Sequence, residues 1–171
     1  DQDFTEYIYP ATMHNTLLFF TQKGRCFWLK CYEIPEGAKN AKGRAIQNIL
    51  NIEADDAINA VLRIKKFDDE EFVKSHYVVF ATKNGLIKKT CLEAYSRPRA
   101  NGVNAINILE GDQVVAVRLT NGNNEIILAN RNGRAIRFNE DSIRTMGRVS
   151  TGVRGMKLDD GDDQVVGMIV V

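Results

Sequence analysis

Basic side chains recur at one place in a repeated sequence pattern, close to glycine-containing turns. Three times a short apolar run is followed by Lys23-Gly24, Asn84-Gly85 or Asn132-Gly133, and then by a second run that carries cations. Cations placed at intervals along a surface neutralise successive phosphates of a nucleic acid and release its counterions. The pattern therefore indicates phosphate binding. The candidate residues are Arg25, Lys30, Lys39, Lys42, Arg44, Lys88, Lys89, Arg97, Arg99, Arg134, Arg137, Arg144, Arg148 and Arg154.

Recurrence carries this prediction, because a single surface lysine is usually only solvated. Few aromatic residues lie between the cations, and this disfavours single-stranded nucleic acid, whose bases stack on aromatic rings. Duplex DNA contacted through its backbone, without base readout, fits the pattern better. The net charge is only +1, so the distribution of charge matters more than its sum. If the repeat holds, we expect the cations to lie on a different face from the acidic clusters at 53–56, 68–71, 110–112 and 159–163.

The chain offers no recognisable catalytic or metal-binding motif. His14 and His76 are isolated, and no catalytic triad, Walker loop or zinc-ligand spacing is present. The acidic run at 159–163 lacks the spacing and the final glutamate of an EF-hand loop, so it predicts a solvated turn. We therefore expect neither a catalytic residue nor a metal site in this chain.

The cysteines and the hydrophobic runs bear on the cellular compartment. Cys26, Cys31 and Cys91 are odd in number and form no paired framework, which indicates a reducing cytoplasm. Cys26 and Cys31 are expected to face opposite sides of one strand and to be buried thiols. No apolar run approaches the roughly 18 residues that a membrane helix needs, and no signal peptide is recognisable.

Antiparallel strands must position the cations. Asn-Gly between β-prone runs predicts a hairpin with a type I′ turn. The expected hairpin strands are 17–21 with 25–32, 76–82 with 86–91, and 125–129 with 134–138. Further strands are expected at 46–52, 58–64, 104–109, 114–119, 152–158 and 165–171. The insertion 68–71 is predicted to be a solvated loop, and short helical turns are predicted at 92–95 and 139–145.

The glycine spacing indicates an internal repeat. Gly43, Gly102 and Gly152 of the basic loops follow the three hairpin glycines at similar distances along the sequence. They either supply turns or let a backbone approach a phosphate closely, and both interpretations stay open. Four antiparallel strands per unit of roughly 45–60 residues are typical of propeller blades. We predict an all-β, propeller-like domain with units at 5–56, 57–112 and 113–163 and a further strand at 164–171. Such a set does not close a ring, so an excerpt of a longer protein is expected.

Three stretches resemble the C-terminal domain of DNA gyrase A, from the type IIA topoisomerases. They are Lys83–Thr90, Gly43–Ile46 and, most specifically, 138–162 with its core Arg144–Met156. The resemblance extends over essentially the whole chain. It implies a β-pinwheel, which is a propeller-like ring of six four-stranded blades that exchange strands with their neighbours. The present chain would hold about three of these blades.

The resemblance also implies a function. In that family duplex DNA wraps around a basic rim, and the holoenzyme introduces negative supercoils in an ATP-dependent manner. The cations named above would be the DNA-binding residues. The expected partners are duplex DNA and, in an A2B2 parent assembly, gyrase B, with no membrane. The expected location is the bacterial cytoplasm, in association with the nucleoid.

The chain itself is expected to be a binding module and no enzyme. The glutamine-arginine-glycine box of the family is not found, and no tyrosine lies in the catalytic motif. The resemblance implies that ATP and Mg²⁺ act through other domains or subunits. Two alternatives stay open: the similar C-terminal domain of topoisomerase IV, and a propeller-type protein-interaction scaffold. The match over Thr151–Leu158 favours gyrase.

Overall fold

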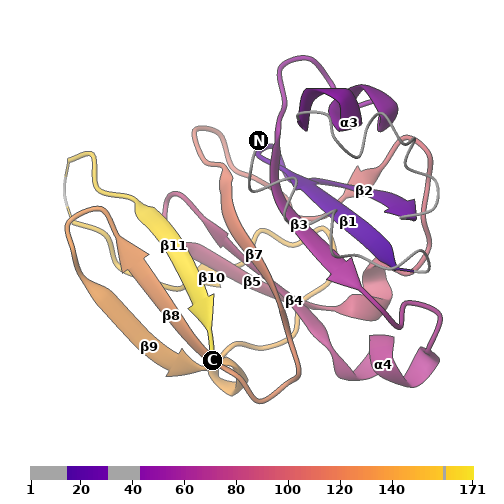
Figure 1. Cartoon of the computed structure of the whole chain (residues 1–171). Coiled ribbons are helices and arrows are strands. Elements are labelled where there is room, and N and C mark those ends of the chain that lie inside the picture. Colours follow the sequence, from indigo (N-terminus) through magenta and orange to yellow (C-terminus); the bar gives the residue numbers. More distant parts are fainter. Residues whose placement is uncertain (1–14, 31–42, 160) are drawn as a thin grey trace.

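A computed structural model describes residues 15–30, 43–159 and 161–171, with the side chains of 43–45 left out. Figure 1 shows β-sheets standing side by side, with two short helices at their margin. The strands are β1 (Thr16–Thr21), β2 (Arg25–Lys30), β3 (Ile58–Ile64), β4 (Tyr77–Thr82), β5 (Leu86–Cys91), β6 (Val103–Asn104), β7 (Val114–Thr120), β8 (Glu125–Asn130), β9 (Ala135–Asn139), β10 (Val153–Arg154) and β11 (Val165–Val170). The helices are α3 (Gly43–Ile49) and α4 (Glu70–Ser75), and the 3₁₀ turns are η2 (Leu92–Tyr95) and η3 (Glu140–Ser142).

The described strands form three antiparallel sheets, and each sheet combines two neighbouring repeats. The first has the order β3-β1-β2-β6, the second β10-β5-β4-β7 and the third β11-β8-β9. A hairpin forms the centre of the first two sheets, while both flanking strands come from later in the chain. The predicted all-β class is confirmed, and so is the exchange of strands between neighbours that the resemblance implied.

Both faces of the central strands are buried, because the sheets pack on one another and α3 covers the outer face of the first sheet. Leu18 and Phe20 of β1 face the second sheet, where the Phe20 ring meets Phe80 edge-on with ring centroids 5.3 Å apart. Alternate residues point to opposite sides of a strand, so Leu17 and Phe19 form a separate cluster on the other face. This double burial explains why β1 reads as one continuous apolar run.

The second interface repeats the arrangement of the first. Val79 and Ala81 of β4 pack against Ile126 and Leu128 of β8, and all four side chains are inaccessible to solvent. Burial of this kind stabilises a sheet stack by about 25 cal/mol for each Å² of apolar surface removed from water. The stack is therefore held by apolar contacts along its whole described length.

The hairpin turns differ from the predicted type. A type I′ turn needs positive φ at two consecutive positions, yet Asn51 is the only non-glycine described residue with positive φ. Instead Gly85 is the last residue of a four-residue turn and has a positive φ of +94°. Its N–H donates to the carbonyl of Thr82 at 3.1 Å and closes the turn. Gly24 and Gly133 close equivalent turns at 3.0 and 3.2 Å. The type I′ prediction is wrong, because three residues connect the strands of the first two hairpins and four connect those of the third.

Three further local predictions need correction. A strand is expected at 46–52, but α3 forms there because Ile46 and Leu50, one helical turn apart, both bury against the face of β1. The insertion 68–71 leads into α4, whose first turn is capped by the Asp69 carboxylate. The strands expected at 104–109 and 152–158 shorten to β6 and β10. The helical turns expected at 92–95 and 139–145 are confirmed as η2 and η3.

Candidate nucleic-acid interface

Successive sheets are joined by the same backbone hydrogen bonds. The N–H of Val114, at the start of β7, donates to the carbonyl of Gln22 at 3.1 Å. One repeat later, the N–H of Val165, at the start of β11, donates to the carbonyl of Lys83 at 2.9 Å. The contact recurs, so each later sheet is attached in the same way to the hairpin turn of the sheet before it. Equivalent turn residues therefore make equivalent contacts in successive sheets.

The hairpin glycines hold the strands that come from the next repeat. The carbonyl of Gly24 accepts from the N–H of Ala105 at 2.7 Å, just after β6. The carbonyl of Gly85 accepts in the same way from Gly155 at 2.8 Å, just after β10. The edge strands β6 and β10, here called outer strands, are thereby fixed beside the hairpin turns of the sheets that they join. We call the end of the outer strand next to this turn the corner of the sheet.

Each sheet carries an arginine beside its hairpin turn, and in the third sheet, whose described strands include no outer strand, we also call this place the corner. Arg25 directly follows Gly24 on β2, and Arg134 directly follows Gly133 next to β9. In the second sheet Leu86 has this position, and the arginine lies opposite it, because Arg154 of β10 pairs with Leu86. We call Arg25, Arg154 and Arg134 the corner arginines. The recurring contacts give each of them an equivalent place beside a hairpin turn.

The first corner is a small, ordered cluster of cations. The guanidinium of Arg25 donates to the carbonyl of Asn101 at 2.6 Å and to Oδ1 of Asn104 at 3.1 Å. Arg148, from the loop before β10, donates to the carbonyl of the same Asn104. Two guanidinium groups from repeats far apart in sequence therefore share one short backbone segment.

The other corner arginines differ in their partners. Arg134 donates to the carbonyl of Lys157 at 3.0 Å and lies 3.0 Å from the carboxylate of Asp159. The side chain of Arg154 is exposed, and its guanidinium makes no hydrogen bond or ion pair with the described residues. A cation without a protein partner is available to an anionic ligand at no cost in broken contacts.

Lys88 and Lys89 are buried, which corrects the prediction that they lie on a basic rim. The side chain of Lys88 is inaccessible to solvent, and only 5% of Lys89 is exposed. Neighbours on a strand point to opposite faces, and both faces of β5 are covered by other sheets. Lys89 instead forms an ion pair with the fully buried Glu140 at 3.2 Å. In this structure neither ammonium group can reach a phosphate.

The remaining predicted cations have varied positions. Lys30 is exposed at the end of β2 remote from the corner, and Arg137 of β9 is paired with Glu125 at 3.4 Å. Three further cations, all exposed in loops, are Arg97, Arg99 and Arg144. Lys39, Lys42 and the side chain of Arg44 lie outside the described residues. The DNA-binding role of this whole set stays a prediction.

Acidic turns meet the hairpin turns, so the two signs of charge are not on separate faces. Asp56, Asp112 and Asp163 are equivalent: each accepts from the backbone N–H of a hairpin residue, at 3.1, 2.9 and 3.3 Å. Lys23 also forms an exposed ion pair with Asp55, and its ammonium lowers the pKa of that carboxyl. The expected segregation of charge is wrong at these turns, because the carboxylates satisfy backbone donors there.

The structure favours the structural interpretation of two loop glycines. A Cβ at Gly152 would lie 2.5 Å from the carbonyl oxygen of Ile87, and one at Gly102 would lie 2.9 Å from that of Cys26. Real Cβ atoms do not approach an oxygen so closely. Both glycines therefore let an outer strand lie against its hairpin, whereas Gly43 begins α3.

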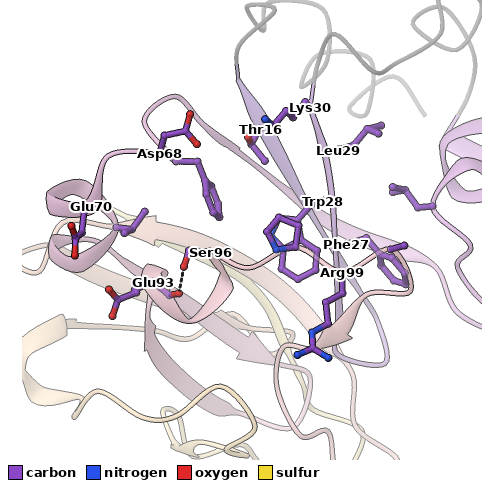
Figure 2. A pocket seen from close by; sticks show the side chains of 15 residues that line it. Thr16, Phe27, Trp28, Leu29, Lys30, Asp68, Glu70, Glu93, Ser96 and Arg99 are labelled. Carbon is purple, nitrogen blue, oxygen red and sulfur yellow. Dashed lines mark hydrogen bonds between the residues drawn. The ribbon is translucent and has the colours of Figure 1, made fainter.

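A cavity of about 610 Å³ lies between β2, α4 and the loop after η2. Figure 2 shows its lining, with the ring of Trp28 near the centre and the hydroxyl of Ser96 bonded to the carbonyl of Glu93. Lys30 and Arg99 contribute positive charge, while carboxylates line the side of α4. Over the described part of the chain, no group of three residues could hold a metal ion, and no helix is long and apolar enough to cross a membrane.

Comparison with known proteins places the chain in a family. Residues 15–65, 76–121 and 124–171 match the family model described as DNA gyrase C-terminal domain, beta-propeller. The chain belongs to this family. As a DNA gyrase C-terminal domain it is 43% identical over 170 residues to the DNA gyrase A of Salmonella typhimurium, which covers 99% of the chain and 19% of the relative. It is 47% identical to that of Halalkalibacterium halodurans over 156 residues, 91% of the chain and 18% of the relative.

Solved structures agree with this membership. The C-terminal domain of DNA topoisomerase IV superposes with a TM-score of 0.79 at 34% identity, over 93% of this chain and 48% of that one. A DNA gyrase A C-terminal domain superposes with a TM-score of 0.75 at 23% identity, over 94% and 49%. The predicted gyrase resemblance and the β-pinwheel architecture are confirmed. This gyrase C-terminal domain spans about a fifth of the length of the gyrase A relatives that it matches.

Proposed function

We propose that this gyrase C-terminal domain binds duplex DNA along its corner arginines and bends the duplex around the edge of the sheet stack. The observation that carries the proposal is the placement of Arg25, Arg154 and Arg134 at equivalent corners of three successive sheets. Family membership supports the same function, because the relatives are DNA gyrase proteins.

The spacing of the corners suits a DNA backbone. Packed sheets lie about 10 Å apart, and this is roughly three base-pair steps along a duplex. Guanidinium groups bind phosphate oxygens through two parallel hydrogen bonds, so each corner can hold one phosphate group firmly. Contacts of this kind position a duplex without reading its sequence. A curved series of corners then favours a curved DNA path, because each phosphate bound draws the duplex toward the next sheet.

The activity of the longer protein belongs to the same proposal. The parent is proposed to be a type II topoisomerase that introduces negative supercoils, with ATP and Mg²⁺ bound by other domains or subunits. In an A2B2 assembly with gyrase B, the bent DNA would be presented for strand passage. The proposed location is the bacterial cytoplasm, at the nucleoid.

Salt dependence of duplex binding tests the contact surface. Arg134→Ala with Arg154→Ala should lower the slope of log affinity against log salt by about 2, because each lost phosphate contact removes roughly one counterion. Lys65→Ala with Lys66→Ala is the matched control, since these exposed lysines leave β3 away from the corners. Equal slopes for the two double variants would refute the corner arginines as the contact. A flat salt dependence of the unaltered chain would favour a protein-interaction scaffold.

A plasmid assay tests the bending in the intact parent protein. The parent is mixed with a relaxed circular plasmid and treated with a nicking-closing topoisomerase, and the change in linking number is read on a gel. The Arg134→Ala, Arg154→Ala parent should shift the linking number less than the unaltered parent while still cleaving DNA. An unchanged shift would remove the wrapping role from these residues.

A further inference from the structure

The buried ammonium group of Lys88 joins two loops next to the first corner. The Nζ atom of Lys88 donates to the carbonyl of Ala105 at 2.6 Å, to the carbonyl of Arg148 at 2.7 Å and to the hydroxyl of Tyr95 at 3.2 Å. Ala105 follows β6 of the first sheet, whereas Arg148 precedes β10 of the second. Lys88 itself lies on β5, so its ammonium group ties together loops that serve two different sheets.

The site suits an ammonium group and lacks a carboxylate partner. The Nζ atom lies 4.7 Å from the centre of the Phe80 ring and 5.8 Å from that of Tyr95, where the ring faces attract a cation. No acidic side chain of the described residues forms an ion pair with it. An ammonium group has three N–H donors, which equals the number of its oxygen partners here. A neutral amine has only two N–H donors, and its hydrogen bonds to the two carbonyls lose the positive charge that strengthens them.

The Arg148 contact connects Lys88 to the candidate interface. The backbone of Arg148 is held by Lys88, and its guanidinium is held by the carbonyl of Asn104. Asn104 also binds Arg25. We propose that Lys88 is a positioning residue which fixes Arg148 beside Arg25, so that the strength of duplex binding depends on whether Lys88 is protonated. The inference rests on the proposed DNA-binding function.

Lys88 can change its charge near neutral pH. Burial away from water, followed by repulsion from the Arg148 guanidinium, lowers the pKa of Lys88 to about 7. Cys26 of β2 and Tyr95 of η2 share its cluster, and burial raises the pKa of both, so that both stay uncharged. The elements β1 and β4 contribute the apolar rings Phe20 and Phe80. His76, at the end of α4, bonds to the carbonyl of Phe72 instead.

The first test measures duplex affinity from pH 6.0 to 8.5 at constant ionic strength. The unaltered chain should bind more weakly as the pH rises through about 7, and its salt slope should fall by about 1 as Arg148 is released. Lys88→Met, which keeps the length but has no charge, should show the weaker affinity at every pH. If the folded Lys88→Met chain matches the unaltered chain in affinity and pH profile, the inference is overturned.

The second test needs no DNA. The amide nitrogen of Val149 belongs to the same peptide group as the Arg148 carbonyl, so its chemical shift reports the Lys88 contact. In the unaltered chain it should titrate with a midpoint near pH 7, and Tyr95→Phe, which removes one acceptor, should move the midpoint lower. A flat Val149 shift across this range overturns the inference. Absence of salt-dependent duplex binding at every pH refutes the proposed function instead, whatever Val149 does.

Discussion

Replacing the hairpin glycines one at a time separates two contributions to the stability of the stack. Gly85 and Gly133 close equivalent turns with nearly equal φ, +94° and +88°. A Cβ at Gly85 would lie 2.6 Å from the carbonyl oxygen of Met156, whereas a Cβ at Gly133 would meet nothing within 4 Å. Alanine at either position has the same left-handed strain, but only at Gly85 does it also collide with a neighbouring backbone.

The expected costs follow from these contacts. Left-handed backbone costs a non-glycine residue about 1–2 kcal/mol, and this is the whole expected loss for Gly133→Ala. In Gly85→Ala the collision also pushes away the segment after β10, which donates to the Gly85 carbonyl through Gly155 at 2.8 Å and Met156 at 3.2 Å. Two such bonds are worth about 1–3 kcal/mol together. Gly85→Ala should therefore cost about 2–5 kcal/mol in total.

Urea unfolding at neutral pH, followed by far-ultraviolet circular dichroism, measures both losses. The fluorescence of Trp28, which packs beside the core between the first two sheets, gives a second signal from the first sheet. The reasoning requires Gly85→Ala to be clearly less stable than Gly133→Ala. If the two variants lose the same free energy of unfolding within about 0.5 kcal/mol, the close approach of the outer strand contributes nothing, because differences of that size are typical of neutral surface changes.

Two further predictions concern buried and capping charges. Lys89→Met should destabilise the fold by about 3–5 kcal/mol, because it leaves the Glu140 carboxylate buried without its cation. Adding Glu140→Leu should restore part of the lost stability. Thermal unfolding of both variants checks this, and an equal loss of stability in the double variant would contradict it. Partial burial alone would raise the pKa of Asp163, but hydrogen bonds from backbone N–H groups and from Asn130 outweigh it and lower the pKa. Its stabilisation is therefore complete above about pH 4 and is lost as the pH falls through the lowered pKa. Asp163→Asn should flatten the acid limb of a plot of stability against pH, and a limb of unchanged steepness would exclude this role.

The hairpins were predictable because their signals are local. A glycine turn between two β-prone runs needs only a few residues, and all three hairpins form as expected. The helix α3 was not predictable in the same way. Gly43–Leu50 and Gly102–Leu109 share the ending Asn-Ile-Leu, yet only the second contributes a strand, since tertiary packing of Ile46 and Leu50 decides the conformation of the first.

The candidate site was predictable only in part. Arg25 and Arg134 follow hairpin glycines and could be found from the repeat, but Arg154 joins them through a strand exchanged between repeats, which no local pattern encodes. The burial of Lys88 and Lys89 did have a signal. They are adjacent on a central strand, and a strand covered on both faces buries both of two neighbours. The prediction placed them on the hairpin strand 86–91 but took both side chains to lie on the basic rim.

Strand exchange also determines when each sheet can be completed during synthesis on the ribosome. Cys26 of β2 pairs with Val103, and Ile87 of β5 pairs with Val153. Each hairpin is therefore synthesised well before the outer strand that pairs with it. At roughly 5–20 residues per second, the delay is on the order of several seconds. During that time the outer edge of β2 is unpaired in the nascent chain and open to wrong pairing with other strands. Slower translation would lengthen this vulnerable interval, and faster translation would shorten it.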